Sequence, residues 1–281
     1  MLPTLTRAHV DSCRFERWYP SFQAVTFDSK CLELPSAFIE YLHADGLVLP
    51  GVNSSLPPPH PDACADTDDD DDPAPQASVI EELDSSDDES DAVADPALQF
   101  PDVLAWIGSS IESLGGAVLP KLNWSAPKDA VWIMANQTLK STNAEDIVLL
   151  LKSSDYIAHD LGAPYEACDD GAPDVRPDKL HLVLREWFDL QQSNEFRCFV
   201  RNNCLIGALI SYPFAAAYFV SGISQRDHLN FYDFLPPLAR GLRSTIADFF
   251  YTHIVNVFPE RDCTFSLHFA LFGHYSLFAS F

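Results

Sequence analysis

Basic residues are scarce in this 281-residue sequence, which has 17 Lys and Arg against 41 Asp and Glu and a formal net charge of −24. Proteins that bind nucleic acid by neutralising phosphates need a basic surface, so the charge disfavours that class. The acidic excess is local, because residues 61–95 hold 15 Asp and Glu and no Lys or Arg. The rest of the chain is only mildly acidic and has the apolar content of a globular protein.

Closely spaced cysteines are also missing. The seven cysteines are odd in number, scattered, and include no C-x-x-C pair, so neither a disulfide framework nor a zinc knuckle is indicated. The first twenty residues contain no apolar signal core, since Arg7, Asp11 and Arg14 interrupt them. We therefore expect a reducing, cytoplasmic location.

The composition changes abruptly over residues 54–97, which are rich in Pro, Asp, Ser and Ala and include an unbroken run from Asp68 to Asp72. Such a segment has too few apolar residues to offset its ordering entropy, so we interpret it as a disordered acidic insertion. Ser85 and Ser86 each have an acid three residues on, a pattern that suits an acid-directed kinase. A solvated spacer that is never modified explains the same residues equally well.

Elsewhere the periodicity predicts a mixture of helices and strands. Apolar residues at helical spacing predict helices over 35–43, 103–114, 142–151 and 238–257, and Gly115-Gly116 ends the second of these. Short strands are expected at 117–119 and 181–184. Residues 195–201 and 204–206 form a predicted hairpin about Asn202-Asn203. This order favours an α+β or α/β protein with two lobes.

Two uncharged runs, residues 204–223 and 263–281, are long enough to suggest membrane segments. Gly207 and Pro213 interrupt the first run, whose leading residues also belong to the predicted hairpin. His268 and His274 lie inside the second run. A membrane-associated protein is thus an alternative, although the less favoured one.

Several linear motifs follow one another in order: FERWYPSF (15–22), SLGGAVLPKLNWSAPKDAVWI (113–133), LLLKSSDYI (149–157), LVLREWFDL (182–190), EFRCFVRNNCLIG (195–207) and ISQRD (223–227). Together they resemble the cell division cycle protein 123 family. The resemblance implies an ATP-grasp-like fold with two α+β lobes that clamp ATP and magnesium. It also implies a role in assembling trimeric translation initiation factor 2 through binding of its gamma subunit, with no nucleic acid and no membrane as partner.

The residues within these motifs are compatible with a nucleotide site. Lys121 leaves a strand and can offset phosphate charge, although such a lysine can also be a solvated strand end. Asn123, Ser125 and the backbone amides around Ala126 can donate to oxygens. The resemblance implies the following cofactor-binding residues: Lys121, Asn123, Ser125, Ala126, Arg185, Glu186, Trp187, Glu195, Arg197 and Arg226.

The roles of the remaining candidates rest on their place in the predicted elements. Arg185, Glu186 and Trp187 follow an apolar strand, where a hinge with an adjacent aromatic residue could frame a purine. An exposed ion pair beside a core tryptophan is the alternative. Glu195 and Arg197 share one face of a strand. Arg226 could reach the triphosphate or simply pair with Asp227.

The chain also departs from the family pattern. In the family, Ile-Gly runs directly into Ile-Ser-Gln-Arg-Asp, whereas residues 208–222 separate these motifs here. After a segment like 262–265, the family carries an Asp-x-Tyr strand and a strand ending in Asp-Phe-Asn-Pro, whose acids and amide bind magnesium. This chain ends instead in SLHFALFGHYSLFASF. We therefore expect the metal ligands to be missing, and a translated intron or an alternative transcript is the economical explanation.

These observations predict an α+β, two-lobed ATP-grasp-like fold whose second lobe is incomplete and leaves a sheet edge open. The expected parts are 1–53 and 98–187 in the first lobe, 54–97 as the acidic insertion, 188–265 as the second lobe interrupted at 208–222, and 266–281 as a divergent apolar tail. The expected function is that of an ATP-binding assembly chaperone for initiation factor 2, in an impaired form. An ATP-grasp ligase or kinase is the enzymatic alternative, but the tail lacks the metal carboxylates that it needs.

Overall fold

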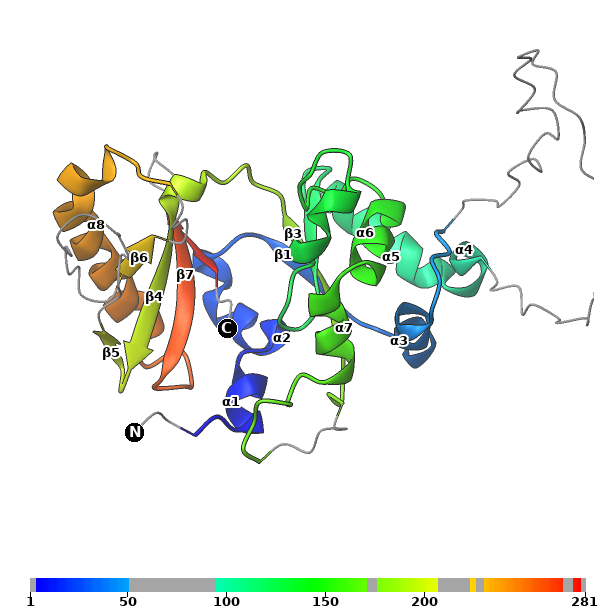
Figure 1. Cartoon of the computed structure of the whole chain (residues 1–281), viewed down its shortest axis with the longest axis horizontal. Coiled ribbons are helices and arrows are strands. Elements are labelled where there is room, and N and C mark those ends of the chain that lie inside the picture. Colours follow the sequence, from blue (N-terminus) through cyan, green and yellow to red (C-terminus); the bar gives the residue numbers. More distant parts are fainter. Residues whose placement is uncertain are drawn as a thin grey trace, which may run out of the picture.

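The computed structural model describes residues 4–50, 95–170, 176–206, 223–225, 230–269 and 275–278. Predictions about Ser85, Ser86, most of the acidic insertion, residues 208–222 and Arg226 lie outside this part of the chain. Two separate antiparallel sheets organise the described residues, with helix α2 (Phe15–Phe22) between them (Figure 1). The α+β class predicted from the sequence is confirmed.

The first sheet has the strand order β1-β3-β2. Its strands are β1 (Ser29–Glu33), β2 (Val118–Lys121) and β3 (His181–Glu186), and both pairings are antiparallel. The short strand expected at 117–119 is therefore longer in the structure and includes Lys121. This difference matters, because it makes Lys121 the last residue of β2 and not a residue of the following loop.

Helices cover one face of the first sheet (Figure 1). Local caps fix the start of α6 (Ala144–Lys152) and the end of α5 (Pro101–Ser113), and the second of these lies at the Gly115-Gly116 pair predicted from the sequence. In α6, Oδ1 of the N-cap Asn143 accepts from the backbone N–H of Asp146 at 2.7 Å. After α5, Gly115 and Gly116 have φ of 86° and 87°, and the N–H of Gly116 donates to the carbonyl of Ile111. The helices of this layer are α3 (Ser36–His43), α4 (Pro96–Gln99), α5 (Pro101–Ser113), α6 (Ala144–Lys152) and α7 (Asp155–Gly162), with the 3-10 helix η2 (Lys128–Ile133).

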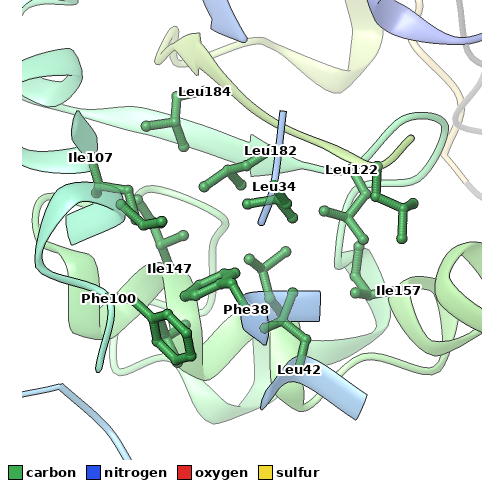
Figure 2. Packing of buried hydrophobic residues seen from close by; sticks show 14 of the residues in the cluster. Leu34, Phe38, Leu42, Phe100, Ile107, Leu122, Ile147, Ile157, Leu182 and Leu184 are labelled. Carbon is green, nitrogen blue, oxygen red and sulfur yellow. The ribbon is translucent and has the colours of Figure 1, made fainter. Parts of the chain in front are cut away.

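The helical layer and the first sheet share one hydrophobic core. Figure 2 shows Leu182 and Leu184 pointing from β3 toward Phe38 of α3 and Ile147 of α6. All four of these side chains are fully buried. Alternate residues of β3 therefore serve the core, and the residues between them face the opposite side of the sheet.

The second sheet is built around β4 (Glu195–Arg201). It pairs on one side with β5 (Cys204–Ile206) and β6 (Ile223–Gln225), and on the other with β7 (Cys263–Phe269). The predicted hairpin is confirmed, since Asn202 and Asn203 have φ of 50° and 60° and connect β4 to β5. These two asparagines adopt the left-handed conformation that a tight hairpin turn requires.

The tail beyond β7 supplies a strand that the sequence analysis did not predict. Residues 275–278 form β8, which pairs antiparallel with β7 from Ser266 opposite Phe278 to Phe269 opposite Tyr275. The edge of β7 that we expected to be open is thus paired, because backbone hydrogen bonding does not require the sequence of the family. Among the described residues, no helix combines the length and apolarity needed to cross a membrane.

A second hydrophobic core lies between the second sheet and the helices packed on it. Buried Phe196, Cys198 and Val200 of β4 contact Phe250 and other residues of α8 (Leu235–Phe249) and its π-helical continuation η4 (Phe250–Ile254). Leu238 was expected on the buried face of α8, but 48% of it is exposed, because the buried stretch starts further along the helix, with Ile246.

Helix α2 contributes Phe15, Trp18 and Phe22 to this second core. The core also includes Val183 of β3, which belongs to the first sheet. The amino-terminal segment, which the sequence analysis assigned to the first lobe, therefore packs on both sheets. The remaining short elements are α1 (Arg7–Ser12), η1 (Gln23–Val25) and η3 (Gln192–Asn194).

Candidate functional site

The face of the first sheet that looks away from the helical layer carries two cations. In the β2–β3 register, Leu119 lies opposite Arg185 and Lys121 lies opposite Val183. Since neighbouring residues of a strand point to opposite faces, Lys121 and Arg185 share the face that does not contribute to the first core. Helix α2 covers this face.

Phe15 of α2 lies beneath both cations. The ammonium of Lys121 is 5.3 Å from the centre of the Phe15 ring, and the guanidinium of Arg185 is 5.7 Å from it. Phe15 itself is fully buried. A cation above an aromatic face gains about 0.5–2 kcal/mol, which offsets only part of the cost of burying two positive charges.

Lys121 and Arg185 are only 6% and 4% exposed. Burial, and then the charge of Arg185, lower the pKa of Lys121 to about 7. Burial also lowers the pKa of Arg185, although a guanidinium remains charged at physiological pH. Arg185 donates to the hydroxyl of Thr26 at 3.1 Å. Within the described residues, the Lys121 ammonium has no hydrogen bond or ion pair.

A small pocket opens beside this cation pair, at the end of β3. Aromatic rings form much of its wall, and the rings of Phe27 and Phe188 are stacked with centres 4.5 Å apart. Arg185 reaches the pocket, and Leu119 connects it along β2 to Lys121. The full lining is Phe27, Leu119, Arg185, Glu186, Trp187, Phe188 and Leu190.

Glu186 and Trp187 lie where the sequence placed the hinge, on the segment that leads from β3 to the second sheet. Their backbone is anchored, since the N–H of Glu186 donates to the carbonyl of Asp28 and that of Trp187 to the carbonyl of Ala117. The Trp187 ring packs against the small cluster around Ala130 and Leu150. Burial, and then Asp28, raise the pKa of Glu186.

The loop after β2 is held by bonds within the chain. Asn123 is fully buried: its amide donates to the carbonyl of Lys179 at 2.9 Å and accepts from the N–H of His181 at 2.6 Å. Ser125 donates both its N–H and its hydroxyl to Asp160, each at 2.7 Å. The carbonyl of Ala126 accepts from the N–H of Lys128. These groups therefore fix the loop beside the two cations.

Glu195 and Arg197 lie on β4 of the second sheet and are half-buried. They point away from the face on which Phe196 and Cys198 join the second core. They therefore belong to the other side of the hinge from Lys121 and Arg185. Arg226 is outside the described residues.

Four residues around the cation pair were not predicted as site residues. Phe15, Phe27 and Phe188 are apolar, and nothing in their spacing distinguishes them from core residues. Phe15 does lie in the FERWYPSF motif and Phe188 in LVLREWFDL, and membership of these motifs was the available signal. Asp160 gave no signal, because its role depends on a contact 35 residues away along the chain.

The chemistry of this arrangement suits an anionic ligand with a flat, apolar part. Two buried cations favour phosphate oxygens, and the aromatic pocket beside them suits a planar ring. Adenosine triphosphate fits this donor set. Among the described residues, no cluster of three or more His, Cys, Asp or Glu could hold a metal ion. No step involving magnesium is therefore derived.

The comparison with known proteins agrees with the order of motifs. The model of the D123 family matches residues 18–271. A protein of Sclerotinia sclerotiorum named "Translation initiation factor eIF2 assembly protein" is 36% identical over 267 residues, which are 94% of this chain and 58% of that protein. A Xenopus laevis protein of the same name is 37% identical and is covered to 70% of its length. The chain thus spans little more than half the length of its fungal relatives.

A solved structure resembles the model closely. "Structure of Cdc123 from Schizosaccharomyces pombe" matches with a TM-score of 0.70 and 30% sequence identity, covering 98% of this chain and 85% of the other. The match therefore includes both sheets and not one of them alone.

Proposed function

Because this chain belongs to the D123 family, we propose that it is an assembly factor for translation initiation factor eIF2 that binds ATP at the face formed by Lys121, Arg185 and the neighbouring pocket. The part of the proposal that concerns eIF2 rests on the names of the relatives. The part that concerns ATP rests on the site itself.

The observation that carries ATP binding is the buried Lys121 ammonium, which has no hydrogen bond or ion pair within the described residues. A buried charge without a partner is costly, and a second cation beside it raises the cost. Phosphate oxygens between Lys121 and Arg185 would remove that cost. Two cations buried side by side are destabilising on their own, which is typical of a site built for an anionic ligand.

The proposal places the purine of ATP against the small pocket at the end of β3, whose free volume of about 20 Å³ holds little more than a water molecule, so its side chains must move apart to admit a ring. Phe27, Trp187 and Phe188 line it, and Arg185 belongs to both the pocket and the cation pair. Glu186 and Trp187 lie on the connection between the sheets, so ATP held there would contact the first sheet and the hinge together. We expect binding to stiffen this connection and to favour one arrangement of the two sheets.

We further propose that the partner is the gamma subunit of eIF2 and that the chain supports assembly by presenting a nucleotide-bound surface. Binding, and not phosphoryl transfer, is the proposed role.

Residues 208–222 are proposed to be retained intron sequence, which reading the transcript across these codons tests directly. Magnesium, when bound with ATP, would neutralise phosphate charge, but this chain's described residues supply no cluster for it.

Nucleotide titration tests the site. Wild-type chain and Lys121→Met are compared by calorimetry with ATP, and we expect a loss of affinity of roughly 10- to 100-fold, as for removal of a charge-assisted hydrogen bond. Lys179→Met is the matched control, because Lys179 is exposed and pairs with Glu33 at 2.7 Å. Equal ATP binding by wild type and Lys121→Met would refute the assignment.

Assembly is tested in cells depleted of their own copy of the assembly factor. The chain, Lys121→Met, and a chain that lacks residues 208–222 are each expressed, and eIF2 subunits are recovered with the tagged gamma subunit. We expect Lys121→Met to recover less complete eIF2 than the unaltered chain does. If the gamma subunit never associates with any version, the proposed partner is wrong.

A further inference from the structure

A buried carboxylate lies behind the cation pair. Asp160 of α7 is 2% exposed, and its carboxylate accepts three hydrogen bonds, all from the loop after β2. The backbone N–H of Trp124 donates at 3.2 Å, and the N–H and hydroxyl of Ser125 each donate at 2.7 Å. No Lys or Arg of the described residues forms an ion pair with Asp160.

The three hydrogen bonds explain how the carboxylate tolerates burial, but they do not explain why a charge stands there. A neutral side chain could accept from this loop without the desolvation cost of a carboxylate. The charge acts on Lys121 instead. Asp160 favours the charged form of Lys121, and Lys121 in turn favours the ionised form of Asp160, whose pKa burial raises.

The loop that follows Lys121 is anchored at its other positions too. The N–H of Leu122 donates to the carbonyl of Ser125, and the N–H of Phe15 donates to that of Asn123, each at 2.9 Å. Asp160 is the anchor from the helical layer. Losing it would release Trp124 and Ser125 from the helical layer and leave the loop held only by Asn123 and the backbone bonds above.

Other charges around Lys121 come from every element that packs against it. Arg185 on β3 and Lys128 on η2 disfavour its charged form, whereas Glu16 on α2 favours it together with Asp160. Cys31 on β1 also responds to the charge of Lys121. Of the two acids, Asp160 is the fully buried one, so its charge is screened least by water.

We propose that Asp160 is the positioning residue for Lys121: its three hydrogen bonds hold the loop that continues from Lys121, and its carboxylate supplies a buried negative charge on that side of the ammonium. The consequence for ligand binding rests on the proposed function. The coupling between Asp160 and Lys121 is a property of the unliganded chain and is measured without any ligand.

The test follows the titration of Lys121 by NMR on the full chain, with the lysine signals assigned through Lys121→Met. Asp160→Asn keeps the shape and removes the charge, so Lys121 should lose its proton at lower pH than in the wild type. Asp129→Asn is the matched control. Asp129 supports the same helix, accepting from the Ser154 hydroxyl at 2.5 Å and from the Asp155 N–H at 2.7 Å, and is not among the charges that act on Lys121.

A second measurement keeps the proposal testable if Asp160→Asn does not fold. In Lys121→Met, the carboxyl signal of Asp160 should titrate at higher pH than in the wild type, since the coupling is mutual. The proposal is overturned if the Asp160 carboxyl titrates at the same pH in Lys121→Met as in the wild type. It is also overturned if the titration of Lys121 moves equally in Asp160→Asn and Asp129→Asn.

ATP titrations of the same variants separate the two proposals. If Lys121 titrates at lower pH in Asp160→Asn and the affinity for ATP also falls, both the positioning role and the ATP site are supported. If Lys121 titrates at lower pH in Asp160→Asn but the wild type does not bind ATP, the positioning role is supported and the proposed ATP site is wrong.

Discussion

The backbone N–H of Phe15 in α2 donates a 2.9 Å hydrogen bond to the carbonyl of Asn123, in the loop after β2. The Phe15 ring belongs to the core of the second sheet, yet it lies beneath the two cations of the first. One residue therefore joins the candidate anion site to both sheets. We therefore expect a change at the cations to alter the packing of α2, and through the shared core also that of α8.

Phe15→Ala tests this double role. Emptying a fully buried phenylalanine site costs about 3–5 kcal/mol of folding stability. The cations also lose their aromatic partner, so ATP affinity should fall as well. Phe38→Ala is the control, because Phe38 is equally buried in the first core but touches neither cation. Denaturant unfolding measures the stability of both variants, and calorimetry measures their affinity for ATP. A similar loss of ATP affinity in Phe38→Ala would attribute the effect of Phe15→Ala to general destabilisation.

Asn123→Ala separates a loop-holding role from direct contact with a ligand. Its amide bridges Lys179 and His181, so the substitution leaves one part-buried carbonyl and one part-buried N–H without this partner. The expected loss is about 1–3 kcal/mol for each group, in the absence of any nucleotide. Asn136→Ala, at an exposed asparagine of the same lobe, should unfold nearly like the wild type. A full-stability Asn123→Ala chain that fails to bind ATP would instead make Asn123 a ligand contact.

Much of the fold could be predicted because its signals are local. The glycine pair after α5 and the Asn202-Asn203 turn each depend on a few neighbouring residues, and each appears where expected. The position of Lys121 at a strand end was also predicted. Its burial was not, because the residue that covers it, Phe15, is more than a hundred positions away.

Features that arise from contacts between residues far apart in the chain could not be predicted from the sequence. The edge strand β8 formed from residues whose order resembles no family strand, since pairing with β7 uses the backbone. Asn123 and Ser125 were expected to donate to a ligand, but their donors already have partners that sequence spacing does not reveal. The domain boundaries remain a prediction, although α2 shows that the amino-terminal segment packs on both sheets.

Deleting residues 54–94 should leave the melting temperature nearly unchanged. The described chain on either side of this segment meets in the first core, since Tyr41 of α3 and Phe100, before α5, have ring centres 5.7 Å apart. Both rings belong to the first core, which a short Gly-Ser linker would not disturb. Thermal unfolding of the deleted and complete chains checks this. A fall of many degrees would mean that the acidic segment packs on the folded part.

The pH dependence of Lys121 gives the last prediction. Its pKa is 10.5 in an ordinary lysine and about 7 in the folded chain. Between these values the unfolded chain binds a proton that the folded chain does not, so the contribution of Lys121 to stability rises with pH in this window. Below pH 7 the buried charge destabilises in full. Lys121→Met should therefore stabilise the unliganded chain most below pH 7, and this gain should shrink toward pH 10.5.

An anionic ligand reverses the preference. Phosphate oxygens favour the charged ammonium and raise the pKa of Lys121, so ATP binding at pH 8 should take up a proton and the affinity should fall as pH rises above 7. Calorimetry in two buffers with different ionisation enthalpies measures that proton directly. Lys179→Met keeps the wild-type uptake, since Lys179 is exposed. Binding without proton uptake in the wild type would show that Lys121 does not meet the phosphates.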